Sequence, residues 1–115
     1  MPLSRKEYAR FYYAKNRIML INKLKERRAK LKYSVIYHYS KGVNECACCQ
    51  EKEIKFLCVD HIKGGGTQHR IKIGRSQLYL WLKRNNFPLG FQILCYNCNA
   101  AKGFYTKCPH QNKTE

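Results

Sequence analysis

Two CxxC pairs are the residues of this chain whose types and spacing point most clearly to chemistry. The pairs are Cys46 with Cys49 and Cys95 with Cys98, and residues 50–94 lie between them. Four thiolates in two such pairs are the ligand set of a closed, tetrahedral structural zinc site. The intervening segment is longer than in most zinc-finger patterns, but the entropy of loop closure grows only slowly with length. The sequence therefore predicts a structural zinc ion that joins two distant segments; free buried thiols are the alternative.

An Asp-His pair and an asparagine form a second constellation. Asp60 and His61 stand between the cysteine pairs, and Asn99 directly follows the second pair. A zinc site would bring these side chains close together. A carboxylate and an amide oxygen suit a hard divalent cation, and a neutral histidine can take a proton from water near pH 7. The three residues predict an open metal site with a general base beside it, although a strand-borne Asp-His pair is often only a hydrogen-bonding unit.

Three further cysteines lack a CxxC partner. Cys58 lies in an apolar run and is predicted to be a small core residue. Cys48 lies next to a predicted zinc ligand but lacks the two-residue spacing. The segment Cys108-Pro109-His110 is either a partial metal motif or one half of a free surface pair of cysteines, and we favour the free pair.

The composition is strongly basic. The 115 residues include 23 Lys or Arg and 7 Asp or Glu, a formal net charge of +16. This length predicts one domain with an appendage, and the charge predicts a polyanionic partner rather than a merely solvated surface. The first residues have no apolar signal-peptide core, and no stretch has the length of a membrane span. We therefore expect a reducing cytoplasm, metal-bound thiolates and no membrane partner.

A long helix is expected over residues 1–40, because this segment has no Gly and no Pro after Pro2. Ser4 and Glu7 have the spacing of a capping box, and Gly42 is a suitable stop. Residues 1–45 carry 12 Lys or Arg against 3 acidic residues. The helix is either an amphipathic element packed on the domain or a basic arm along nucleic acid, and a break near Lys32 is an open possibility.

Shorter elements are expected in the rest of the chain. The apolar, β-branched segment Ile54–Ile62 predicts a strand that ends in the loop Gly64–Gly66. Ser76 is a suitable N-cap for a helix over Gln77–Asn85. The core face of that helix would contain Leu78, Trp81 and Leu82. A second strand is expected over Phe91–Leu94 and a helix from Asn99 to Phe104, before a polar tail that starts at Thr106.

Several of these segments together resemble the HNH endonuclease family, and above all its small phage-type members. The segments are Cys46-x2-Cys49, Val59-Asp60-His61-Ile62 and Phe91-Gln92-Ile93-Leu94-Cys95-x2-Cys98-Asn99-x2-Lys102, with the glycine triplet and His69-Arg70 after the first Asp-His-Ile. The resemblance covers about residues 33–110. It implies an α+β fold: a ββα-metal finger braced by the four-cysteine zinc site, with the long basic helix in front. The expected domains are a helical arm (1–40), a nuclease domain (41–110) and a polar tail (111–115).

The resemblance also implies roles for single residues. His61 resembles the family's general base, and Asp60 and Asn99 resemble the ligands of a catalytic Mg²⁺ or Mn²⁺. Gly90 stands where many members have an Asn, and His69 is a candidate to replace that residue or to contact phosphate. Lys63, Arg70 and Lys102 are candidate contacts to the nucleic-acid backbone.

The implied activity is metal-dependent hydrolysis of phosphodiester bonds in double-stranded DNA, leaving 5′-phosphate and 3′-hydroxyl ends, in the cytoplasm of a phage-infected host. The alternative is a non-catalytic zinc-ribbon module that binds nucleic acid. A third hypothesis is a structural metal-binding protein within a ribonucleoprotein, but the Asp-His pair would have no function in such a protein. The oligomeric state, the target sequence, the preferred metal, and nicking versus double-strand cleavage stay open.

Overall fold

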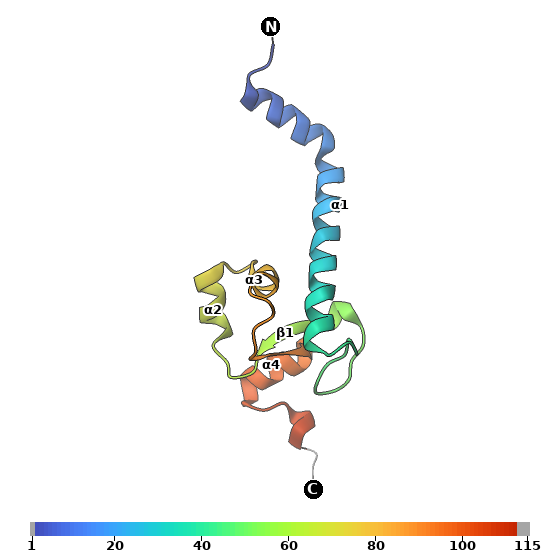
Figure 1. The fold of residues 1–115 in the computed structure, drawn as a ribbon, viewed down its shortest axis with the longest axis vertical. Helices are drawn as coiled ribbons and strands as arrows, with labels where there is room; N and C mark the ends of the chain where they lie inside the picture. The colour runs from blue at the N-terminus through green and yellow to red at the C-terminus, as the bar shows by residue number, and fades with distance from the viewer. Residues whose placement is uncertain (1, 113–115) are drawn as a thin grey trace. The chain divides into compact units, whose positions relative to one another are not determined.

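One long helix, α1 (Arg5–Tyr39), begins the chain in the computed structural model, which describes residues 2–112 (Figure 1). The Ser4 hydroxyl accepts a hydrogen bond from the Glu7 backbone N–H at 3.2 Å, as the capping pattern predicts. At the other end Lys41 has a φ of 57°, and the Gly42 N–H donates to the Tyr37 carbonyl at 2.8 Å. This is the closing geometry of a Schellman motif, so the predicted ends are confirmed, and the helix is continuous through Lys32.

The chain forms two compact units, one ending at Lys30 and the other beginning at Leu31. The last turns of α1 thus belong to the second unit, where Val35 and Ile36 are fully buried. The boundary between the two units lies ten residues before the predicted domain boundary, which was placed at the end of the helix. In the first unit the large apolar side chains are mostly exposed, including Tyr8, Phe11 and Ile18.

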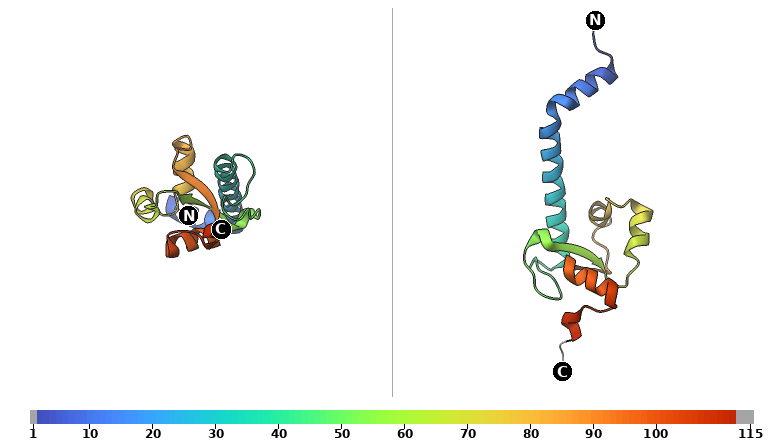
Figure 2. Two further views of the ribbon diagram at one scale, coloured as in Figure 1. Left: turned by 90° about the horizontal axis from the view of Figure 1, so that it is seen from below. Right: turned by 180° about the vertical axis from the view of Figure 1, so that it is seen from behind.

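Two antiparallel strands and a following helix form the centre of the second unit. Strand β1 (Leu57–His61) pairs with β2 (Phe91–Cys95), so that Asp60 lies opposite Gln92. Helix α4 (Tyr96–Tyr105) follows β2 without a loop and contacts both strands (Figure 2). The second strand is confirmed with one added residue, and α4 begins three residues before the predicted start.

The first strand is shorter than predicted. Residues Ile54–Phe56 form the 3-10 turn η1, and β1 starts only at Leu57. The Glu53 carboxylate accepts from the Lys55 backbone N–H at 3.3 Å and caps this turn. A local side-chain cap therefore overrides the strand preference of the apolar residues that follow.

Two short helices, α2 (Gly66–Ile73) and α3 (Leu78–Arg84), come between the two strands in the sequence. In space they lie side by side (Figure 1). The sequence did not predict α2: Gly64 and Gly65 form the expected loop with φ near 80°, but Gly66 already begins a helix. For α3 the predicted cap at Ser76 is wrong, because Gln77 occupies the N-cap position and its side chain makes no capping bond.

The core of the second unit joins α1, the sheet and α3. Its larger buried side chains are Val35, Ile36, Leu57, Val59, Leu78, Leu82, Ile93 and Leu94. The expected face of α3 is confirmed, with Leu78 and Leu82 buried and Trp81 half-buried against this core. The chain then ends its described part in the 3-10 turn η2 (Pro109–Asn112). None of the described helices is long and apolar enough to cross a membrane.

Replacing Leu82 with alanine should lower the free energy of unfolding by about 2–5 kcal/mol, because a fully buried leucine leaves a cavity when truncated. Leu89→Ala is the matched control, since Leu89 is 96% exposed and should change stability by less than about 0.5 kcal/mol. Urea unfolding followed by the fluorescence of the single tryptophan, Trp81, measures both. Equal effects of the two substitutions would contradict this packing.

Candidate functional site

The four cysteines of the CxxC pairs come together beside the sheet. Their sulfur atoms all lie within 4.8 Å of one another, and Cys49 Sγ is 3.7 Å from Cys95 Sγ. A tetrahedral zinc–thiolate site has sulfur–sulfur edges of about 3.8 Å, from Zn–S bonds of about 2.3 Å. The group formed by Cys46, Cys49, Cys95 and Cys98 is therefore compatible with structural Zn²⁺, as the sequence predicts.

Local structure explains how each pair presents its sulfurs. Cys95 ends β2 and is the N-cap of α4, where its sulfur accepts from the Cys98 N–H at 3.4 Å. Cys46 accepts in the same way from the N–H groups of Cys48 at 3.4 Å and Cys49 at 3.5 Å. Hydrogen bonds from the backbone and a helix N-terminus both stabilise thiolate over thiol, which is the state that binds metal.

A second group shares one of these cysteines. The ligand atoms of Cys48, Cys98, Cys108 and His110 also lie within 4.8 Å of one another. The surface position expected for Cys108 is wrong, because its side chain is 5% exposed and turn η2 brings His110 beside it. The geometry instead agrees with the less favoured prediction, in which Cys108 and His110 are part of a metal motif. The prediction for Cys58 is confirmed: it is buried in β1 and donates to the Leu94 carbonyl.

Asp60 is a buried carboxylate held by two donors. Its Oδ2 atom accepts from Gln92 Nε2 at 2.8 Å and from Lys102 Nζ at 2.6 Å. The Lys102 ammonium also donates to the backbone carbonyls of His61 at 3.1 Å and Ile62 at 2.9 Å. Lys102, which the sequence placed at the nucleic-acid backbone, thus fixes the end of β1 and neutralises Asp60. One carboxylate oxygen and two carbonyl oxygens thus bind the positively charged Lys102 ammonium in the folded chain.

His61 is paired with a second histidine. Its Nε2 atom lies 2.9 Å from His69 Nδ1 on α2, and its ring packs edge-on against Phe91. Trp81 in turn packs against His69, with 4.4 Å between ring centroids. Burial lowers the pKa of His61, and the electrostatic interactions with His69 and with the Arg70 guanidinium lower it further. His61 is therefore neutral near pH 7, the form that accepts a proton.

The other ring nitrogen of His61 faces a glycine. A Cβ atom added at Gly66 would lie 2.9 Å from His61 Nδ1. Real Cβ atoms do not approach a ring nitrogen so closely without displacing it. Gly66 has no side chain to cover Nδ1, and no hydrogen bond from the described residues reaches this atom, while Nε2 faces His69.

Asp60 and His61 lie in the lining of a cavity of about 390 Å³ between the end of β1 and α4. The predicted site residues in its lining are Asp60, His61, Lys63, Asn99 and Lys102. Arg70 is not part of this lining, and His69 lies behind His61 rather than in the cavity wall.

Two side-chain oxygens at this cavity, Asp60 Oδ1 and Asn99 Oδ1, make no hydrogen bond within the described residues. The Asn99 Nδ2 group donates to Cys58 Sγ at 3.5 Å, which leaves Asn99 Oδ1 as the atom able to coordinate. The Asp60 Oδ2 atom is engaged by its two donors, which leaves Asp60 Oδ1. One carboxylate and one amide oxygen, with space beside them for water, are the donors that Mg²⁺ and Mn²⁺ use.

Several residues of the site were not predicted from the sequence. Gln92 is recognisable only through the strand register that sets it opposite Asp60. Phe91 and Trp81, which hold the two imidazoles, looked like ordinary core residues. The only sequence signal for the second cysteine group was the short spacing between Cys108 and His110.

The chain matches no protein-family model, and no curated protein or solved structure is significantly similar to it.

Proposed function

We propose that this protein is a metal-dependent endonuclease of the HNH type that hydrolyses phosphodiester bonds in double-stranded DNA. The observation that carries the proposal is the meeting of Asp60, His61 and Asn99 at one cavity, although they come from two separate elements. The order of two antiparallel strands and a helix, β1, β2 and α4, agrees with the ββα-metal finger that the sequence resemblance implies.

His61 acts as the general base in this proposal. Its Nε2 atom is taken up by His69, and its Nδ1 atom is left open by Gly66, so Nδ1 is the nitrogen that accepts the proton of the attacking water. For Nδ1 to accept a proton, the His61 imidazole must be held in the tautomer that carries its proton on Nε2. His69 serves that purpose, which the family assigns to an Asn where this chain has Gly90.

Asp60 and Asn99 would hold the divalent ion through one carboxylate and one amide oxygen. The chemistry supplied by such an ion would be Lewis-acid stabilisation of the negative charge on the leaving 3′ oxygen. The Lys102 ammonium forms an ion pair with Asp60 at the edge of the cavity and donates to the backbone carbonyl of His61 at the end of β1. Lys63, also in the lining, offers a positive charge to the neighbouring phosphates.

Relaxation of a supercoiled plasmid tests the activity. The purified protein should cleave only when Mg²⁺ or Mn²⁺ is added, and chelation with EDTA should stop the reaction. DNA binding without cleavage at any concentration of divalent ion would sink the endonuclease proposal and favour the zinc-ribbon binding module.

Replacing Gly66 with alanine should slow cleavage on the order of 10²-fold, because the new methyl group covers or displaces His61 Nδ1 and disables the base. Moving the His61 ring costs stability and the better helix propensity of alanine offsets part of that cost, so the fold should persist. Thr67→Ala is the control: it places alanine at the next, exposed position of the same helix turn. Single-turnover rates of both variants give the answer, and equal rates would contradict an open Nδ1.

The helical arm supplies affinity in this proposal. The unit that ends at Lys30 is one basic helix whose side chains are largely exposed. Deleting residues 1–30 should weaken DNA binding and reduce the slope of log affinity against log salt, because fewer counterions are released. The cavity residues lie outside the deleted part, so divalent-dependent cleavage should persist at low salt. Fluorescence anisotropy between about 50 and 200 mM salt measures the slope, and an unchanged slope would exclude the arm as a DNA contact.

A further inference from the structure

The second cysteine group has the dimensions of a metal site. His110 Nδ1 lies 3.3 Å from Cys108 Sγ, 3.4 Å from Cys98 Sγ and 3.7 Å from Cys48 Sγ. In a tetrahedral zinc site the nitrogen–sulfur edge is about 3.6 Å, from bonds of about 2.05 and 2.3 Å. The imidazole nitrogen thus occupies the fourth corner of a tetrahedron whose other corners are three cysteine sulfurs.

One sulfur belongs to both groups. Cys98 lies with Cys46, Cys49 and Cys95 in the first and with Cys108 in the second. The Cys98 sulfur is thus shared by two ligand groups that together contain six cysteines and one histidine.

We propose that the two groups form one binuclear zinc cluster, in which the Cys98 thiolate bridges both ions. The seven ligands are Cys46, Cys49, Cys95, Cys48, Cys108 and His110 as terminal ligands and Cys98 as the shared one. Two tetrahedral ions need eight coordination bonds, and six terminal ligands with one bridge supply that number. Soft thiolates and an imidazole are the donors that select zinc over Mg²⁺ or Mn²⁺.

The burial pattern separates this group from a chance cluster of thiols. Cys98 and Cys108 are 1% and 5% exposed, although Cys108 lies beyond α4, in a segment with almost no other buried side chain. Neutral thiols are weak hydrogen-bond partners and give such a segment little reason to fold back. A metal ion joining the segment to the first CxxC loop through Cys48 provides the reason.

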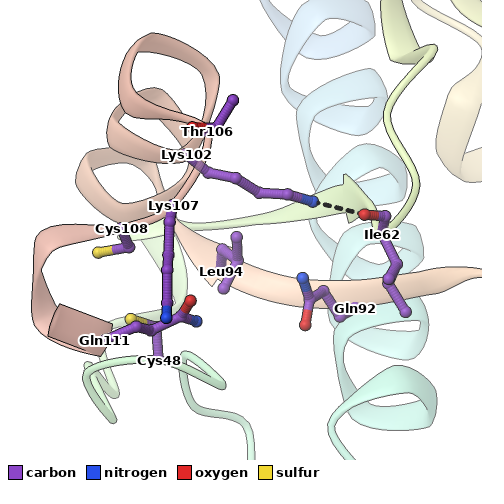
Figure 3. Close-up of a pocket in the computed structure, with 9 residues that line it drawn as sticks. All are labelled: Cys48, Ile62, Gln92, Leu94, Lys102, Thr106, Lys107, Cys108 and Gln111. Atoms are coloured by element: carbon purple, nitrogen blue, oxygen red, sulfur yellow. Dashed lines mark hydrogen bonds between the residues drawn. The ribbon is translucent and has the colours of Figure 1, made fainter. Parts of the chain in front are cut away.

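The second ion would also lie close to the residues that position Asp60. A hollow of about 200 Å³ has Cys48 and Cys108 at one side and Gln92 and Lys102 at the other (Figure 3). Gln92 and Lys102 are the two donors to Asp60. The proposed cluster therefore stabilises one side of this hollow, and Gln92 and Lys102 on the other side hold the Asp60 carboxylate.

Counting zinc ions in the folded protein tests the cluster. Native mass spectrometry under a phosphine reductant should find two zinc ions per wild-type chain. The double variant Cys108→Ser/His110→Ala should retain one ion and its fold, because the first group keeps all four ligands. The matched control is Cys58→Ser/His38→Ala, which removes one thiol and one imidazole outside both groups and should retain two.

Cobalt tests the shared thiolate. Two Co²⁺ ions joined by Cys98 couple magnetically, so the EPR signal of the first equivalent should fall as the second binds. A wild-type count of one zinc, or a count of two that the Cys108→Ser/His110→Ala variant keeps, would overturn the second site and leave the first. A count of zero would overturn both sites. Two uncoupled Co²⁺ ions would overturn the bridge. None of these readouts depends on DNA cleavage, so the endonuclease proposal stands or falls separately.

Discussion

Replacing His61 with alanine should reduce the single-turnover rate of DNA cleavage by roughly 10²–10⁴-fold, the usual contribution of a positioned general base. The imidazole is held by His69 and Phe91 with its Nδ1 atom uncovered, so the substitution removes the proton acceptor itself. The fold and the metal content should persist, because His61 belongs to neither cysteine group and lies outside the buried core. DNA affinity should also change little, since the substitution removes no formal charge.

A second histidine provides the control for this experiment. His38 is exposed and stacks on Phe87, with 4.2 Å between ring centroids, but lies outside the cavity. His38→Ala should cleave at the wild-type rate. Both variants are measured with enzyme in excess over a labelled duplex, across a titration of Mg²⁺ and Mn²⁺. A His61→Ala rate that equals the wild type at every metal concentration would end the proposed mechanism, even with the fold intact.

Replacing Cys95 with serine should unfold the second unit rather than merely lower its activity. Binding of a structural zinc ion contributes on the order of 10–16 kcal/mol in small zinc domains, whereas a whole domain of this size is stable by about 5–15 kcal/mol. Cys95 also caps α4 through its sulfur, so its loss affects the junction of β2 with that helix. A neutral hydroxyl replaces neither the metal bond nor the thiolate charge.

Cys58→Ser is the matched control, because Cys58 is buried in β1 but belongs to neither metal group. Its hydroxyl can keep the bonds to the Leu94 carbonyl and the Asn99 amide. Trp81 reports the outcome, since it is the only tryptophan and contacts His69 and Phe91 in the second unit. Native tryptophan emission from Cys95→Ser, or folded wild type without stoichiometric zinc, would contradict a structural metal.

Local signals determined much of this protein in advance. An uninterrupted run without Gly or Pro, capped by Ser4 and closed at Gly42, specifies α1 whatever the rest of the chain does. The two CxxC pairs carry their chemistry in their spacing, and they met as predicted. The placement of Asp60 on a strand and of Asn99 on a helix was also predicted, from the apolar, β-branched residues before Asp60 and from the helix expected after the second CxxC pair.

Other features became visible only in three dimensions. The glycine triplet looked like a loop, yet its third residue begins α2, and the missing side chain of Gly66 leaves room for the His61 ring. Gln92 joined the site through strand register, and His69 through the packing of α2 beside α3.

The C-terminal segment shows the same limit most clearly. A polar tail after Thr106 gave no periodic signal, so Cys108 and His110 looked like surface residues. His110 lies 62 positions from Cys48 in sequence, and only the folded sheet and α4 bring the two side chains together. Metal ligands are selected by distance in space, and periodicity along the chain does not encode contacts of this range. The sequence by itself thus determined the chemistry available to this protein, and the tertiary structure decided which groups share a site.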